Sequence, residues 1–99
     1  MIMTTDRLKQ YEFIKREFAE LTQNPATAIS GRATALQKEI SEFETFIGGI
    51  QRNDIRQIFQ YRYMQGLSWK VVSKKVYGYL CESRPRRAAE RYLKGELKT

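Results

Sequence analysis

Apolar side chains recur every three or four positions along the first half of the chain, which is the spacing of one face of an amphipathic helix. The pattern predicts a helix over about residues 6–22, which ends before Pro25 because the residue preceding a proline avoids helical backbone angles. A second helix is predicted over about residues 32–47, and the pattern fixes no structure for the connector, residues 26–32. Phe13 lies beside the first apolar stripe and is expected to widen it. The stripe positions are Leu8, Tyr11, Ile14, Phe18 and Leu21 in the first helix, and Leu36, Ile40, Phe43 and Ile47 in the second.

These two predicted helices are too short to form an independent coiled coil, so an antiparallel hairpin is their natural arrangement. The apolar stripes then leave two alternatives open. In one, they pack into the core of a single subunit. In the other, they form a homodimer through residues 5–47, because two stripes rich in aromatic side chains carry a large apolar surface for so small a protein.

Three shorter helices are predicted in the second half of the chain. The first is capped by Asn53 or Asp54 and stops at Gly66. The second spans residues 69–76, and Ser68 is its expected capping residue. Its β-branched residues lower the helix propensity, so this element depends on packing.

A turn over residues 77–82 precedes the last predicted helix, residues 84–94. Ser83 is expected to cap this helix, and Pro85 is tolerated in its first turn because an amide at that position would be unpaired anyway. In the preceding helix, Ser73 is expected to face solvent together with the lysines.

No stretch of the chain alternates with the period of a β-strand. The chain is therefore predicted to be all-α, with an N-terminal amphipathic helical hairpin followed by a three-helix helix-turn-helix unit. Gly48-Gly49 interrupts the helical pattern, which places the predicted domains at residues 1–49 and 50–99. The net charge of +7 divides at the same place, into −1 for residues 1–49 and +8 for residues 50–99. This asymmetry indicates a polyanion-binding half attached to a neutral half.

The basic residues of the last predicted helix gather on one side. At 100° per residue, four of them fall within an arc of about 80°, and the apolar residues fall within a separate arc of about 140°. The major groove of DNA admits one helix, arginine can contact guanine with two hydrogen bonds, and lysine can neutralise phosphates. The basic arc holds Arg84, Arg87, Arg91 and Lys94, and the apolar arc holds Pro85, Ala88, Ala89, Tyr92 and Leu93.

Residues 55–78 carry a resemblance to a known family. They contain Arg62-Tyr63, followed after two residues by Gly66-Leu67-Ser68-Trp69. The stretch resembles the first two helices of a helix-turn-helix of the sigma factor region-four type. It is more closely similar to small phage and prophage regulators of Gram-positive bacteria, which carry an RY-x-x-G-L-S-W segment. The resemblance covers about the last 45 residues, and the turn at residues 77–83 is longer and more aromatic than the family's short link.

In that family an arginine-rich final helix enters DNA, and the matching segment here is residues 84–94. The resemblance therefore implies a transcription regulator or, within the same class, a DNA-packaging subunit, with double-stranded DNA as its partner. Trp69 is expected to be structural. An alternative is a small phage inhibitor or adaptor that binds a host protein, such as RNA polymerase, through the same basic face. The expected contacts to bases or phosphates are Arg84, Arg86, Arg87 and Arg91, and the expected contacts to phosphates are Lys70, Lys74, Lys75 and Lys94.

The composition argues against several other classes of function. Without histidine, the chain has no histidine-based catalytic triad, general base or metal ligand, and no enzyme activity is expected. A single cysteine, Cys81, forms no internal disulfide or thiolate metal cluster, and no cofactor or metal is expected. No apolar run approaches the roughly 18 residues of a membrane span, and the first residues do not resemble a signal peptide. A cytoplasmic location is expected, in the host cell if a phage encodes the chain.

Overall fold

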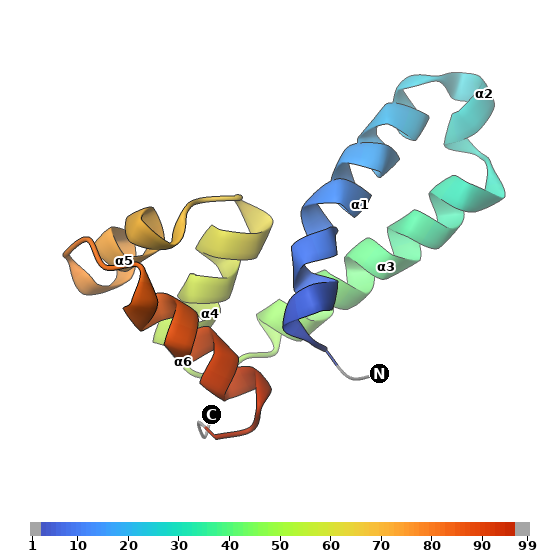
Figure 1. The fold of residues 1–99 in the computed structure, drawn as a ribbon. Helices are drawn as coiled ribbons and strands as arrows, with labels where there is room; N and C mark the ends of the chain where they lie inside the picture. Colours follow the sequence, from blue (N-terminus) through green and yellow to red (C-terminus); the bar gives the residue numbers. More distant parts are fainter. Residues whose placement is uncertain (1–2, 97–99) are drawn as a thin grey trace.

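The computed structural model describes residues 3–96, and every regular element in this part of the chain is a helix. Figure 1 shows a long helical hairpin that leads into a cluster of shorter helices, with overall extents of 46 × 26 × 20 Å. The predicted all-α class is thus confirmed. The elements are α1 (Thr5–Gln23), α2 (Pro25–Ala28), α3 (Gly31–Gly48), α4 (Asn53–Phe59), the π-helical turn η1 (Gln60–Met64), α5 (Trp69–Tyr77) and α6 (Ser83–Leu93). No helix in this described part is both long enough and apolar enough to cross a membrane.

Helices α1 and α3 lie side by side and run in opposite directions, and the single turn of α2 joins them at the tip (Figure 1). The predicted stripes meet inside the hairpin, where the rings of Tyr11 and Phe43 stack with centroids 4.6 Å apart. Both of these side chains, together with Leu36, are buried within the single chain. Phe13 was expected to widen the stripe, and this is wrong: its side chain is 66% exposed on the outer side of α1. A homodimer through residues 5–47 stays a prediction.

The helix after the hairpin changes character part of the way along. Its apolar side chains Ile55, Ile58, Phe59 and Tyr63 are buried. At Gln60 the α-helix gives way to a π turn, in which Gln65 N–H donates to the Gln60 carbonyl at 3.0 Å. The predicted cap is also wrong, because Arg52 occupies the N-cap position and no side chain caps the helix there. Asp54 instead lies in the first turn and accepts the Ile55 N–H at 2.9 Å. The predicted stop is confirmed at Gly66, where φ is +73°.

Helix α5 begins as predicted, since Ser68 Oγ accepts the Val71 N–H at 3.3 Å. It ends at Gly78, which has a left-handed φ of +89°. Ser73 was expected to face solvent, and this is wrong. Its side chain is buried, and its Oγ donates to the Tyr79 carbonyl at 2.7 Å. Ser73 therefore holds the start of the long turn against α5.

Helix α6 begins one residue earlier than predicted. Ser83 is its first residue and not its cap: Glu82 takes the N-cap position, and no side chain makes the capping hydrogen bond. The Ser83 hydroxyl lies 3.6 Å from the sulfur of Cys81. Pro85 occupies the first turn as predicted and is buried there.

A single hydrophobic cluster joins the hairpin to the shorter helices. Phe59 of α4 contacts both parts. The centroid of the Phe59 ring lies 6.0 Å from that of Phe46 in α3 and 5.9 Å from that of Tyr92 in α6. A polar contact adds to this, since Lys15 Nζ of α1 donates to the Met64 carbonyl at the end of η1 at 2.8 Å. The core therefore continues across the predicted boundary at Gly49, and the position of α6 depends on both halves.

Two glycines with opposite backbone requirements give a first testable prediction. Gly66 has a φ of +73°, so Gly66→Ala is expected to lower the free energy of unfolding by about 1–2 kcal/mol through left-handed strain. Gly48 is helical, and a Cβ there meets nothing within 4 Å, so Gly48→Ala is expected to raise it by about 0.4–1 kcal/mol. Urea denaturation followed by circular dichroism measures both. Equal effects of the two substitutions would contradict the prediction.

Candidate nucleic-acid interface

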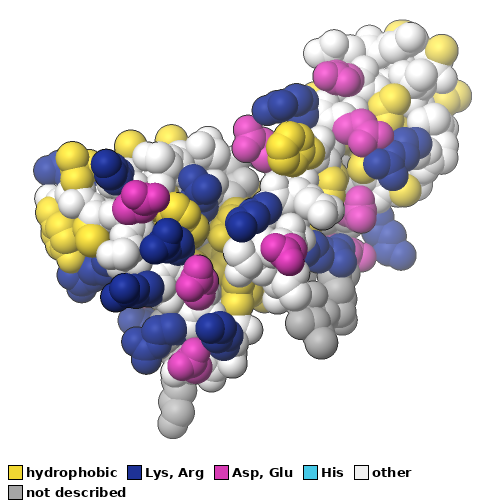
Figure 2. Space-filling model, in the orientation of Figure 1, with side chains coloured by type: hydrophobic (Ala, Val, Ile, Leu, Met, Phe, Trp, Pro, Cys, Tyr) yellow, Lys and Arg dark blue, Asp and Glu magenta, His cyan; other side chains and the backbone are white. Residues whose placement is uncertain are grey.

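The two faces of α6 differ as the sequence predicted. Pro85 and Ala89 are buried against the other helices, while the basic residues of the predicted arc are exposed. Figure 2 shows Lys and Arg side chains gathered at the lower left, over the region of α6, with a few acidic side chains among them. Helix α6 packs closely against the other helices because its core-facing residues Ala88 and Ala89 are small. The exposed row consists of Arg84, Arg87, Arg91 and Lys94.

The charges of this row are available to a partner. Among residues 3–96, no acidic side chain lies within 4.0 Å of the guanidinium nitrogens of Arg84, Arg87 or Arg91. Elsewhere in the same part of the chain, four other arginines are paired with carboxylates. A row of unpaired arginines on a helix with a buried back is a surface suited to a polyanion.

A hollow of about 380 Å³ lies between α4 and α6, and the arginine row forms one side of it. Arg84, Arg87 and Arg91 line it from α6, and Arg52 and Asp54 line it from the start of α4. Arg52 was not among the predicted site residues. It precedes a helix and so belongs to no helical face that periodicity can identify, and only its place in the basic half pointed toward it.

Arg52 and Asp54 form a two-pronged ion pair at the edge of this hollow. Arg52 Nη2 lies 2.8 Å from Asp54 Oδ2, and Arg52 Nε lies 3.1 Å from Asp54 Oδ1. The hydrogen bonds from Arg52 lower the pKa of the Asp54 carboxyl, and Asp54 in turn raises the pKa of Arg52. Both groups are therefore charged at neutral pH, and the carboxylate partly neutralises Arg52.

The aromatic turn after α5 positions Arg84. The Arg84 guanidinium carbon lies 4.0 Å from the ring centroid of Tyr77 and 5.6 Å from that of Tyr79, and Arg84 Nη1 donates to the Tyr79 hydroxyl. Burial raises the pKa of Tyr77, so its hydroxyl keeps its proton at neutral pH. A guanidinium held over one ring and hydrogen-bonded to the hydroxyl of another loses less conformational entropy on binding than a free side chain does.

Arg86 does not join the row. It lines a different hollow, of about 310 Å³, together with Trp69 of α5, Lys9 of α1 and the carboxylate residues Glu82 and Glu90. The physical reason is the helical rotation of about 100° per residue, which turns Arg86 away from its neighbour Arg87. Arg86 therefore faces the side of α6 that carries acidic residues.

The predicted lysines are exposed but lie outside the hollow lined by the arginine row. Lys74 Nζ donates to the Gly78 carbonyl at 3.2 Å, beside the aromatic turn. Lys75 lies around the helix from Lys74, with its Nζ 5.5 Å from the ring centroid of Tyr61. Lys70 and Lys94 lie at the start of α5 and just after α6.

Trp69 is half-buried and packs against η1. Its ring meets that of Tyr63 edge to face, with centroids 6.1 Å apart, and Arg62 lies over it at 4.8 Å. Arg62 also donates to the Leu67 carbonyl at 3.0 Å. These contacts give Trp69 a structural role at the junction between η1 and α5.

The geometry of this surface favours ionic contact. Within residues 3–96, no group of three or more cysteine or carboxylate side chains is placed to hold a metal ion. No protein family model, curated protein or solved structure matches the chain. The arginines of α6 and the residues that hold them are therefore the features of the molecule that bear on its function.

Proposed function

We propose that this chain binds double-stranded DNA and regulates transcription as a phage-type helix-turn-helix protein, with α6 as the helix that enters the major groove. The observation that carries the proposal is the exposed row of Arg84, Arg87 and Arg91, which has no carboxylate partner among residues 3–96. The resemblance of residues 55–78 to phage regulators points the same way.

The dimensions of α6 support this proposal. Its 11 residues give a length of about 16 Å, and a helix fits the major groove, which is about 12 Å wide. Helices α4 and α5 both pack against α6, so its basic face is held on a rigid base. Arginines on such a face can contact guanine edges or phosphates, and the lysines of α5 add phosphate contacts.

The experiment is a fluorescence anisotropy titration of a labelled mixed-sequence duplex at two salt concentrations. With about four phosphates neutralised, a fourfold rise in salt is expected to weaken binding by about 100-fold, because counterions are released on binding. Failure to bind the duplex at low salt would contradict the proposal. Binding to purified bacterial RNA polymerase without DNA binding would favour the adaptor alternative instead.

A further inference from the structure

The hollow between α4 and α6 is lined by a basic residue that does not belong to the helix proposed to enter the groove. Three of its arginines belong to α6, but Arg52 comes from a segment 32 residues earlier in the chain than Arg84. Four arginines and one carboxylate line the hollow, which gives it a charge of +3. A concave surface with this charge attracts anions more strongly than a flat basic face does.

We propose that this hollow is a binding site for a phosphate group, in which Arg52 acts together with Arg84, Arg87 and Arg91. A backbone phosphate of DNA and a free phosphate ester present the same oxygens to the site. The proposal rests on the proposed function only where the phosphate belongs to DNA. In that case Arg52 ties α4 to the DNA backbone while α6 lies in the groove.

The donors of the hollow suit a phosphate. A guanidinium carries five N–H donors in a planar fork, and Asp54 occupies only the Nε and one Nη2 donor of Arg52. Tyr77 and Ser83 also line the hollow. Ile55 and Ala88 add apolar surface to the lining.

Asp54 opposes binding at this site. Its carboxylate neutralises Arg52 and repels an incoming phosphate. The substitution Asp54→Asn removes the charge but retains an Oδ1 that can accept the Ile55 N–H, as Asp54 does at 2.9 Å. Substitutions of the two residues of the ion pair are therefore expected to have opposite effects. Arg52→Ala weakens phosphate binding and Asp54→Asn strengthens it.

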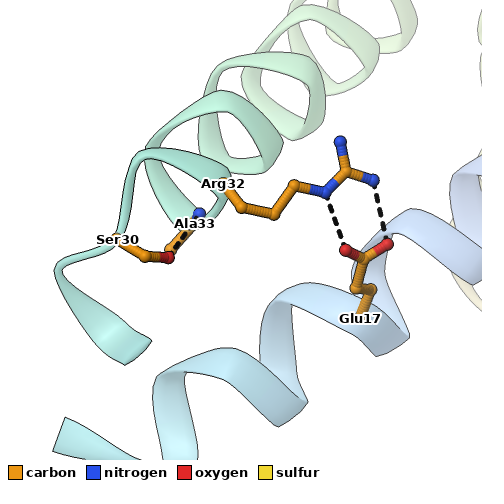
Figure 3. Close-up of polar contacts among 4 residues, drawn as sticks. All are labelled: Glu17, Ser30, Arg32 and Ala33. Carbon is orange, nitrogen blue, oxygen red and sulfur yellow. Dashed lines mark hydrogen bonds and ion pairs between the residues drawn. The ribbon is translucent and has the colours of Figure 1, made fainter. Parts of the chain in front are cut away.

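The hairpin supplies a matched control pair. Arg32 of α3 binds Glu17 of α1 through the same two-pronged geometry, with Nε–Oε2 at 2.7 Å and Nη2–Oε1 at 3.0 Å (Figure 3). The pair lies beside the start of α3, which Ser30 caps through the Ala33 N–H at 3.1 Å. This end of the hairpin is remote from α6 (Figure 1). Arg32→Ala and Glu17→Gln thus make the same charge changes away from the hollow.

The first experiment titrates inorganic phosphate into the full chain and follows the arginine side-chain Nε–H signals by NMR. We expect saturable shifts at the four lining arginines, about fivefold weaker binding in Arg52→Ala and about fivefold tighter binding in Asp54→Asn, the size of one exposed charge contact. Circular dichroism checks that each variant folds. The proposal would be overturned if Arg32→Ala and Glu17→Gln changed phosphate binding as much as Arg52→Ala and Asp54→Asn do. It would also be overturned if the natural chain showed no saturable shift.

The second experiment separates DNA from a free phosphate ester as the source. If the site holds a DNA phosphate, Arg52→Ala is expected to decrease the magnitude of the slope of log affinity against log salt by about one. If the natural chain binds inorganic phosphate at these arginines but no duplex, the phosphate site stands and the proposed DNA function fails. If the chain binds DNA and none of the Arg52 and Asp54 variants alters either titration, the phosphate site fails and DNA binding stands.

Discussion

Phe59→Ala is expected to lower the free energy of unfolding by about 3–5 kcal/mol, the range for removing a buried aromatic side chain. The side chain of Phe59 is completely buried, and its ring contacts Phe46, Tyr63 and Tyr92 from three other elements. Truncation therefore leaves a cavity where the hairpin, η1 and α6 meet. A protein of 99 residues has about 5–15 kcal/mol of net stability, so this substitution is expected to remove a large share of it.

Urea denaturation followed by circular dichroism measures this loss. Phe13→Ala is the matched control, because it removes the same atoms from a side chain that is 66% exposed, and its effect is expected to stay within about 0.5 kcal/mol. A small effect of Phe59→Ala would mean that the hairpin and the shorter helices do not share one core. In that case the hairpin would also be expected to stay folded when residues 50–99 are removed.

The double substitution Arg87→Ala and Arg91→Ala is expected to weaken duplex DNA binding by about 30-fold or more, since each lost arginine contact costs at least about 1 kcal/mol. Both side chains are exposed on α6, and neither has a carboxylate partner among residues 3–96, so their removal leaves no buried charge unpaired. The slope of log affinity against log salt, which is negative, is expected to decrease in magnitude by about two.

The control for this variant removes two positive charges from the hairpin, by Arg16→Ala and Lys38→Ala. Both residues are exposed, and they lie on α1 and α3. This control is expected to retain the affinity of the natural chain within a fewfold, because the net charge changes equally but the contacts of α6 remain. Equal losses in the two variants would show that net charge alone, and not the face of α6, drives association.

Local features of the structure could be predicted from the sequence. The helices over residues 6–22 and 32–47 appear within one residue at each end as α1 and α3, because one apolar stripe and one stop signal define each of them. Ser68 caps α5, and Gly66 adopts a positive φ where the preceding helix stops. The two faces of α6 also follow from the sequence, because a single helix turns each side chain by a fixed angle.

Features that depend on a distant neighbour were missed. Ser73 looked solvent-exposed beside three lysines, but the turn that returns over α5 buries it and supplies the Tyr79 carbonyl as its partner. The π turn at Gln60 is equally invisible to periodicity. It is held by contacts from other elements, such as that of Lys15 with the Met64 carbonyl. The predicted cap at Asp54 was wrong for a local reason: α4 begins at Asn53, so Asp54 lies inside the first turn and accepts the Ile55 N–H there.

The sequence by itself determined that the chain is all-α, where most helices begin and end, and which side of α6 is basic. These properties depend on residues within one or two helical turns of each other, and short-range periodicity and capping encode them. Only the tertiary structure decided that Arg52 lies across a hollow from the arginines of α6. That placement follows from the mutual packing of the rings of Phe46, Phe59 and Tyr92, which are far apart along the chain, and no local pattern specifies it.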